Sequence, residues 1–219
     1  MRRPLKTMLC FLISAVLLLG FWLMEGAPVH NRAAICLRAQ RELLTEDIRP
    51  VKAIRKEGET LMLARAGEQY LSFRYNAPQG VEEPRFGENG VIDYWNGRFY
   101  ALGPEAASAA ITATAYRMTM DPDSRQSTIH EQKTFTYDGI SAGRGAWIFV
   151  VPMDGPDSLP ALCWEWYTLE QGGHAAYRRL INGPVDVTLR LYGDDGAVLT
   201  ELSSTMESRQ FRVLHPVDR

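Results

Sequence analysis

The chain has 219 residues, of which 46% are hydrophobic and 23% are charged, and its formal net charge is −2 at pH 7. This composition excludes a disordered chain, because it supplies enough apolar side chains for a folded core. The slightly acidic balance and the lack of basic runs in the sequence argue against nucleic acid as a partner.

An uncharged apolar run, residues 8–24, follows Arg2, Arg3 and Lys6 and ends before Glu25. The run is longer than a usual signal-peptide core of roughly 7–15 residues and is at the short end of the roughly 17–25 residues that cross a bilayer as a helix. We therefore expect a membrane-targeting element, which is either a transmembrane anchor or a cleaved signal.

The segment after the apolar run offers no good site for signal peptidase. A cut after Ala27 would place Glu25 at position −3 and Pro28 at position +1, and both residues are unfavourable there. A retained anchor is favoured, with residues 1–7 as a cytoplasmic tail because basic residues stay inside. Residues 25–219 then lie outside the cytoplasm, on the cell membrane; cleavage would instead give a secreted protein.

Residues 25–50 form the next expected element, a linker helix that ends before Pro50. Apolar side chains recur there at helical spacing: Ala33, Leu37, Leu44 and Ile48. This pattern predicts a short amphipathic helix. The helix would pack on the domain, and a juxtamembrane stalk or a membrane-surface helix are the alternatives.

Residues 51–103 change from helical to alternating periodicity. Strands are expected at 51–55, 60–64 and 70–75, separated by turns that contain glycine, which is typical of an antiparallel β-meander. Asn96-Gly97 then supplies the two positive-φ residues of a type I′ hairpin turn. The break at Gly103-Pro104 marks an expected subdomain boundary.

Residues 104–219 carry six further segments of strand-like pattern joined by turn-forming clusters. The expected strands are 110–120, 127–137, 145–151, 161–168, 185–192 and 197–202. Short strands with regular turns and little helix favour an immunoglobulin-like β-sandwich. The predicted fold class is therefore mainly β, with a single N-terminal transmembrane helix, a short amphipathic helix, a β-meander and the sandwich.

One short motif suggests catalysis. The sequence Gly139-Ile140-Ser141-Ala142-Gly143 matches the Gly-x-Ser-x-Gly elbow of serine hydrolases, in which the serine lies between a strand and a helix. Here a glycine-rich stretch and a second strand pattern follow, which is typical of a hairpin loop. No catalytic residue is assigned, although a carboxylate pair of the glycosidase type stays open.

Cysteine and histidine spacing gives no cofactor or metal assignment. Cys36 and Cys163 either form one disulfide or are two partly buried thiols, because spacing alone does not show that they come within reach. The four histidines share no metal-ligand spacing. Asp121-Pro122-Asp123 starts like a calcium loop, but Arg125 occupies a ligand position, and a polar turn is the better interpretation.

Aromatic clusters give the remaining hint of function. Trp164 and Trp166 share one face of an expected strand, where the core of a sandwich is the favoured location. The hairpin near residue 95 has aromatic side chains on both faces, which are hard to bury together. Its residues form the candidate binding surface: Tyr94, Trp95, Arg98 and Tyr100.

Three functions are compatible with these patterns. The first is a membrane-anchored extracytoplasmic β-domain with a non-enzymatic binding or structural role at the cell envelope, where its partner is a protein or an envelope glycan. The second is a carbohydrate-binding module that uses exposed aromatics. The third is a secreted hydrolase.

Overall fold

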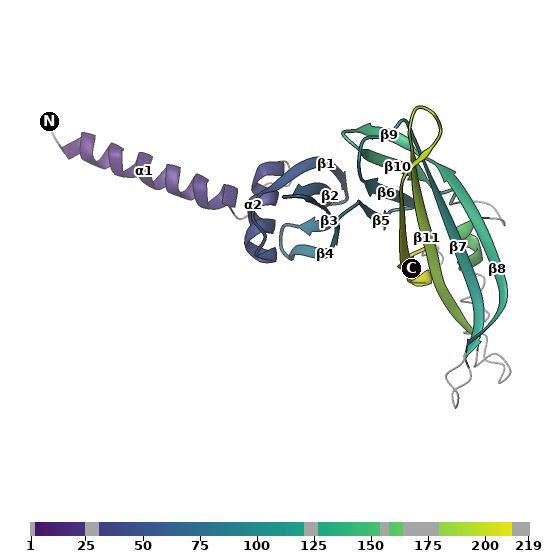
Figure 1. Ribbon diagram of the computed structural model, residues 1–219. Helices are drawn as coiled ribbons and strands as arrows, with labels where there is room; N and C mark the ends of the chain where they lie inside the picture. The colour runs from purple at the N-terminus through teal and green to yellow at the C-terminus, as the bar shows by residue number, and fades with distance from the viewer. Residues whose placement is uncertain (1–2, 25–30, 121–126, 154–157, 164–179, 212–219) are drawn as a thin grey trace. The chain divides into compact units, whose positions relative to one another are not determined.

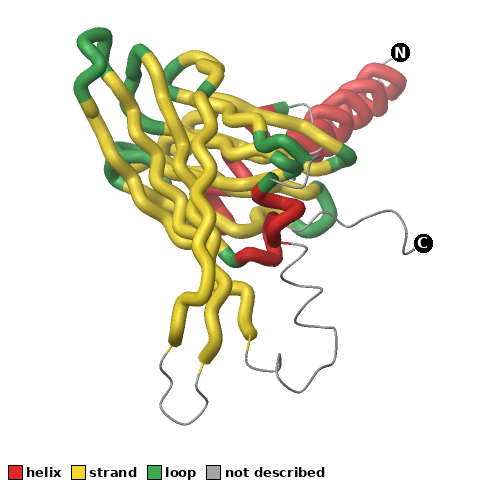
Figure 2. Tube along the Cα trace, turned by 90° about the vertical axis from the view of Figure 1, so that its right-hand side faces the viewer, coloured by secondary structure: helices red, strands yellow, loops and turns green. Residues whose placement is uncertain are grey.

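The computed structural model describes residues 3–24, 31–120, 127–153, 158–163 and 180–211. Strands dominate this part, with antiparallel sheets and a few helices, as the sequence predicts (Figure 2). The chain divides into two compact units, Met1–Val91 and Ile92–Arg219. The division precedes the hairpin at Trp95 rather than following residue 103, because that hairpin joins a sheet of the second unit.

The first helix, α1, spans Arg3–Met24 and so begins before the apolar run and includes Lys6. Its described apolar side chains are largely exposed, for example Phe11 at 73% and Leu17 at 68%. Among the residues that the structure describes, no helix is both long enough and apolar enough to cross a membrane. The expected transmembrane helix over residues 8–24 is therefore not confirmed.

Helix α2 spans Arg32–Leu43, and its two ends have clear local causes. At the start, the side chain of Asn31 accepts hydrogen bonds from the backbone N–H groups of Ala33 and Ala34, at 3.1 and 3.3 Å. At the end, Leu44 adopts a left-handed conformation with φ of 51°. The helix therefore ends well before Pro50, where the sequence pattern places its end.

The buried face of α2 differs from the expected one. Its buried residues are Ala34, Ile35, Cys36 and Ala39, whereas Leu37 and Leu44 are 50% and 92% exposed. Ile48 is buried but belongs to a strand. Ile35, Cys36 and Ala39 form the contact with the sheet, whereas Leu37 and Leu44 do not. The helix packs on the domain and is not a separate linker.

The first unit contains one four-stranded antiparallel sheet in the order β1-β2-β3-β4. The strands are β1 Ile48–Lys56, β2 Glu59–Ala66, β3 Gln69–Asn76 and β4 Gly80–Gly87. The first three confirm the predicted meander. The fourth was not predicted, since Glu82-Glu83-Pro84 interrupts any apolar alternation. One face of the sheet forms a core with α2, in which Phe73 and Tyr75 are fully buried.

The second unit contains two four-stranded antiparallel sheets (Figure 1). The first sheet has the order β5-β6-β10-β9, with β5 Val91–Trp95, β6 Arg98–Leu102, β9 Ile140–Gly143 and β10 Ala146–Val150. The second has the order β12-β11-β7-β8, with β7 Ser108–Met120, β8 Ser127–Asp138, β11 Leu180–Tyr192 and β12 Val198–Met206.

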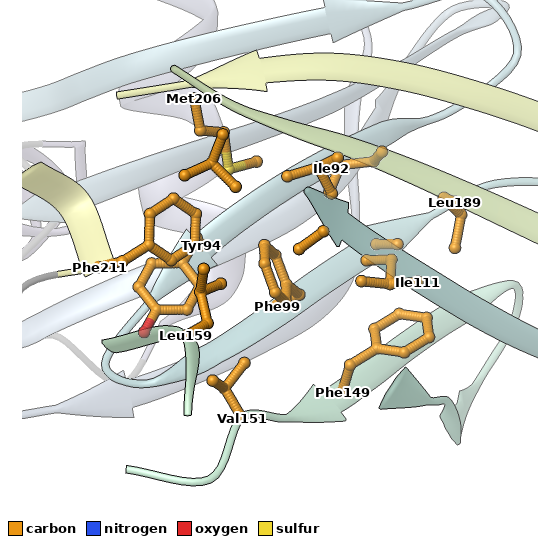
Figure 3. Packing of buried hydrophobic residues seen from close by; sticks show 14 of the residues in the cluster. Ile92, Tyr94, Phe99, Ile111, Phe149, Val151, Leu159, Leu189, Met206 and Phe211 are labelled. Atoms are coloured by element: carbon orange, nitrogen blue, oxygen red, sulfur yellow. The ribbon is translucent and has the colours of Figure 1, made fainter. Parts of the chain in front are cut away.

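Both sheets contribute to one hydrophobic core (Figure 3). In β7 the buried side chains are every second residue, from Ala109 to Ala115, and in β11 the same alternation runs from Val185 to Leu191. Such period-2 burial is what a sheet with one inner face requires. Phe99 and Phe149 fill the core from the other sheet.

The segment expected as a strand at 161–168 is helical at residues 159–163, and residues 164–168 lie outside the described part. Ser158 starts this turn: its Oγ accepts from the N–H of Ala161 at 3.2 Å, and its carbonyl accepts from the N–H of Leu162 at 3.0 Å. A serine cap followed by a proline in the first turn is a helix-start signal. Leu159 and Cys163 enter the core. A short 3₁₀ helix, η1 Ser208–Phe211, adds Phe211.

Candidate functional site

The hairpin of β5 and β6 carries the candidate binding surface, and its turn is as predicted. Asn96 and Gly97 have φ of 50° and 74°, as a type I′ turn requires. A Cβ on Gly97 would lie 2.5 Å from the sulfur of Met153, so a side chain there would also require the Met153 side chain to move. The N–H of Val151 donates to the carbonyl of Gly97 at 3.2 Å. The segment after β10 therefore covers the tip of the hairpin.

The structure buries the three aromatic residues of the candidate surface. Tyr94, Trp95 and Tyr100 are 4%, 7% and 2% exposed, and Arg98 is the exposed member of the set. The ring of Tyr94 lies 5.0 Å from that of Phe99 and 4.3 Å from that of Phe211, inside the core shown in Figure 3. Buried rings cannot stack on a sugar or anchor a partner without local unfolding.

The electrostatics of the hairpin also point to a structural role. Burial raises the pKa of the Tyr94 hydroxyl well above its usual range. Burial raises the pKa of Tyr100 as well, although Arg98, which hydrogen-bonds its hydroxyl, opposes this change. Both phenols therefore stay protonated at neutral pH and are poor candidates for acid–base chemistry.

Asp93 is a polar core residue that the sequence analysis did not single out. It is fully buried, and its Oδ1 accepts a hydrogen bond from the N–H of Tyr94 at 2.8 Å. Its position in the sequence indicates this role, because a carboxylate between Ile92 and Tyr94 interrupts an otherwise apolar strand. A buried carboxylate needs hydrogen bonds to offset its desolvation, so Asp93 constrains how β5 packs.

Ser141 lies in a β-hairpin, as the sequence pattern indicates. It belongs to β9 and pairs with Trp147 of β10, and the turn between the strands uses Arg144 and Gly145 at φ of 55° and 74°. Its Oγ is exposed and accepts from the N–H of Gly143 at 3.3 Å. A strand follows instead of a helix, so the geometry of a nucleophile elbow is not formed.

The two cysteines outside α1, Cys36 and Cys163, are not joined by a disulfide. Cys36 lies in the core of the first unit and Cys163 in the core of the second, so each sulfur is enclosed by its own hydrophobic cluster and the disulfide alternative is not formed. Burial raises the pKa of the Cys36 thiol to about 11. Cys36 is therefore protonated and weakly reactive at neutral pH.

Several other residues considered in the sequence lie outside the part of the chain that the structure describes. Asp121 and Asp123, the Trp164 and Trp166 pair, and three of the four histidines (His30, His174 and His215) fall on residues that are not described. Within the described ranges, no group of three or more His, Cys, Asp or Glu side chains could hold a metal ion.

The outer face of the sheet β12-β11-β7-β8 carries a polar surface that the sequence analysis missed. We call it the hydroxyl face, and it consists of Thr112, Thr114, Thr134, Thr136, Thr188, Ser203 and Thr205. The hydroxyls of Thr114 and Thr134 are 3.0 Å apart, and that of Thr205 donates to Asp186 at 2.9 Å. The signal was the alternation of threonine and apolar residues along β7.

The hydroxyl face offers donors and acceptors for hydrogen bonds but no activated nucleophile. Burial and a hydrogen bond to Asp186 raise the pKa of the Tyr116 hydroxyl, which borders this face. Asp186 therefore accepts from both Tyr116 and Thr205. A carboxylate held in this way orders the surface and is already engaged as an acceptor.

Comparisons with known proteins give no match. No family model matches the chain, and no curated protein and no solved structure is significantly similar to it. Function must therefore be argued from the geometry and the sequence.

Proposed function

We propose that this chain is a membrane-tethered, non-enzymatic binding or structural protein of the cell envelope. Helix α1 is the tether, residues 1–7 lie in the cytoplasm, and residues 25–219 lie on the outer side of the membrane. The two β-rich units form the exposed domain, whose partner is a protein or a glycan of the envelope.

The observation that carries this proposal is the surface of α1. Its large apolar side chains lie exposed on the protein: Met8, Phe11, Leu12, Ile13, Val16, Leu17, Leu18 and Leu19 are each at least half exposed. Burying one such side chain is worth roughly 1.5–3 kcal/mol. A contiguous surface of this kind marks a contact with a membrane or another protein. Arg3 and Lys6 lie at the N-terminal end of α1, which favours an orientation with this end on the cytoplasmic side of the membrane.

The arrangement of possible catalytic groups supports a non-enzymatic role. The hydroxyl of Ser141 accepts a hydrogen bond from the N–H of Gly143 in its own turn, and a strand, not a helix, follows it. The phenols of Tyr94 and Tyr100 are buried and protonated. These facts favour binding over the hydrolase alternative.

The second unit would act as an immunoglobulin-like sandwich that displays a surface. Two antiparallel sheets with a shared core support this reading, and sandwiches of this kind commonly bind through loops or one sheet face. The hydroxyl face is the polar surface available for such binding. A carbohydrate module of the aromatic-stacking type is less well supported, since Trp95 is buried.

Membrane fractionation tests the tether. Full-length protein should stay in the membrane pellet after an alkaline wash, and the double variant Leu17→Glu/Leu18→Glu should move to the soluble fraction, because two charges in an apolar helix oppose insertion. Leu37→Glu is the matched control, since Leu37 is a half-exposed apolar residue of α2 and should leave the distribution unchanged. Wild-type protein in the wash supernatant, or a shortened soluble form, would refute the tether.

A further inference from the structure

Sheet edges expose unpaired backbone groups, and among the strands that the structure describes six lie at an edge: β1, β4, β5, β8, β9 and β12. Edge strands of soluble proteins usually carry prolines, charges or bulges, or are short, because an open edge pairs with other chains.

Five of the edges have a recognisable protection. Strand β1 contains Pro50 and four basic residues, and β4 contains Pro84 flanked by charges. Strands β5 and β9 have only five and four residues. Strand β8 carries Lys133 on its inner side, with the ammonium 5.7 Å from the ring centre of Phe135.

Strand β12 is the least protected of the six edge strands. It has nine residues and contains no proline and no basic side chain. Its one charge, Glu201, is held by Arg190 of β11 at 2.6 Å. A bulge lies at its start, opposite Leu191 and Tyr192, and the stretch 200–206 beyond it is regular. Within the described part of the chain, β12 pairs with β11 alone.

We infer that β12 pairs antiparallel with β12 of a second copy of this chain, which joins the two β12-β11-β7-β8 sheets edge to edge. A two-fold axis opposite Leu202 places Glu201 against Ser203 of the second copy. An axis opposite Ser203 places Glu201 against Thr205 of the second copy. In both registers the strand's single charge meets a hydroxyl, so the edge is complementary to itself in charge.

The side chains on both faces of β12 fit this pairing. Leu202 is half-buried on the inner side and packs against the core, so two copies extend one apolar layer across the axis. Ser203 and Thr205 point to the outer side, so the hydroxyl face continues from one copy into the other. This inference concerns self-association and does not depend on the membrane tether.

Charge substitutions at Ser203 test the inference, with the dimer dissociation constant of the full chain measured in detergent micelles by analytical ultracentrifugation. Ser203→Glu places like charges opposite each other in both registers, so it should weaken the dimer about tenfold. Ser203→Lys distinguishes the registers. With the axis at Leu202, the new lysine lies opposite Glu201 of the second copy and strengthens the dimer. With the axis at Ser203, it lies opposite the same lysine of the second copy and weakens the dimer.

Thr136→Glu is the matched control, because Thr136 lies in the same cross-strand row on the opposite edge strand, β8. It should leave the dissociation constant unchanged. A wild-type chain that stays monomeric at about 100 μM, where a dimer with a dissociation constant of about 1 μM would be mostly formed, overturns the inference. A dimer that Ser203→Glu and Ser203→Lys leave unchanged also overturns it, since the contact then lies elsewhere, for example in α1.

Discussion

At the tip of the β5–β6 hairpin, Trp95 exposes 7% of its surface, and its ring lies 6.4 Å from that of Tyr100. The aromatic spacing of this hairpin predicts a surface that binds ligands, because an isolated two-stranded hairpin cannot bury both of its faces. The sequence could not show that the hairpin lies within a larger sheet, in which β6 pairs with β10.

Replacing Trp95 with alanine should therefore reduce stability. Removing a buried tryptophan leaves a cavity and costs about 3–5 kcal/mol. Arg98→Ala is the control on the same hairpin, and its exposed side chain should change the free energy of unfolding by less than about 0.5 kcal/mol. Urea denaturation measures both values. Equal stability of Trp95→Ala and the wild type would show that Trp95 is a surface residue.

Cys36 gives a pH dependence with a defined sign. Burial raises the pKa of its thiol from 9.0 to about 11 in the folded chain, whereas the unfolded chain keeps the ordinary value. Between these values the unfolded state binds fewer protons, so the free energy of unfolding falls as pH rises, by at most about 1.4 kcal/mol per pH unit.

The variant Cys36→Ala isolates this contribution. We expect the stability of the wild type to fall more steeply than that of the variant between pH 9 and 11, as measured by urea denaturation in steps of pH. The tyrosines titrate equally in both proteins and cancel in the difference. Parallel curves for the two proteins would contradict a buried thiol at this position.

At the scale of elements, the sequence predicts a turn with local chemistry correctly but does not predict which face of a helix is buried. The Asn96-Gly97 turn was predicted because its chemistry is local. The buried face of α2 was predicted wrongly, since the leucines at 37 and 44 outweighed Ala34 and Ala39 in the apolar pattern. The sequence does not show from which side the sheet packs on the helix, and therefore does not show that Ile35, Cys36 and Ala39 form the contact. Asn31, a preferred N-cap residue, is a sequence signal for the start of α2 at Arg32.

The end of α2 holds a residue that is poorly suited to its backbone. Leu44 has φ of 51° and a side chain that is 92% exposed, so it gains little packing for a conformation that glycine adopts freely. Leu44→Gly should therefore raise the free energy of unfolding by up to about 1 kcal/mol. Thermal denaturation tests this change, and a lower melting temperature for the variant would refute it.

Arg38 connects α2 to the turn between β3 and β4. Its guanidinium contacts Glu42 at 2.5 Å and donates to the carbonyl of Ala77 at 2.9 Å, while Glu42 accepts from the N–H of Val81 at 2.7 Å. The hydrogen bond to Glu42 raises the pKa of Arg38 further, so the charge is permanent. This cluster fixes the helix on the sheet.

Arg38→Ala should lower the free energy of unfolding by about 1–3 kcal/mol, since it leaves the Glu42 carboxylate without its cation. Arg32→Ala is the control on the same helix, because Arg32 is exposed and the change should be small. Equal effects of the two substitutions in urea denaturation would show that the cluster adds nothing.

At the scale of the whole molecule, the sequence predicted a β-rich chain but not how its strands are shared among sheets. The pairing of β7 with β11 joins segments far apart in the chain, and no local pattern encodes it. The same holds for β6 and β10, which move the hairpin at Trp95 into the second unit. The hydroxyl face exists only because these pairings place its threonines in rows.

Cysteine labelling of intact cells shows on which side of the membrane the β-rich units lie. Thr136→Cys introduces an exposed thiol on β8, whereas Cys36 and Cys163 are buried and should give little background. In full-length protein recovered from the membrane fraction, a membrane-impermeant maleimide should label Thr136→Cys without lysis. Labelling that requires lysis would place the β-rich units inside the cell and contradict the proposed orientation.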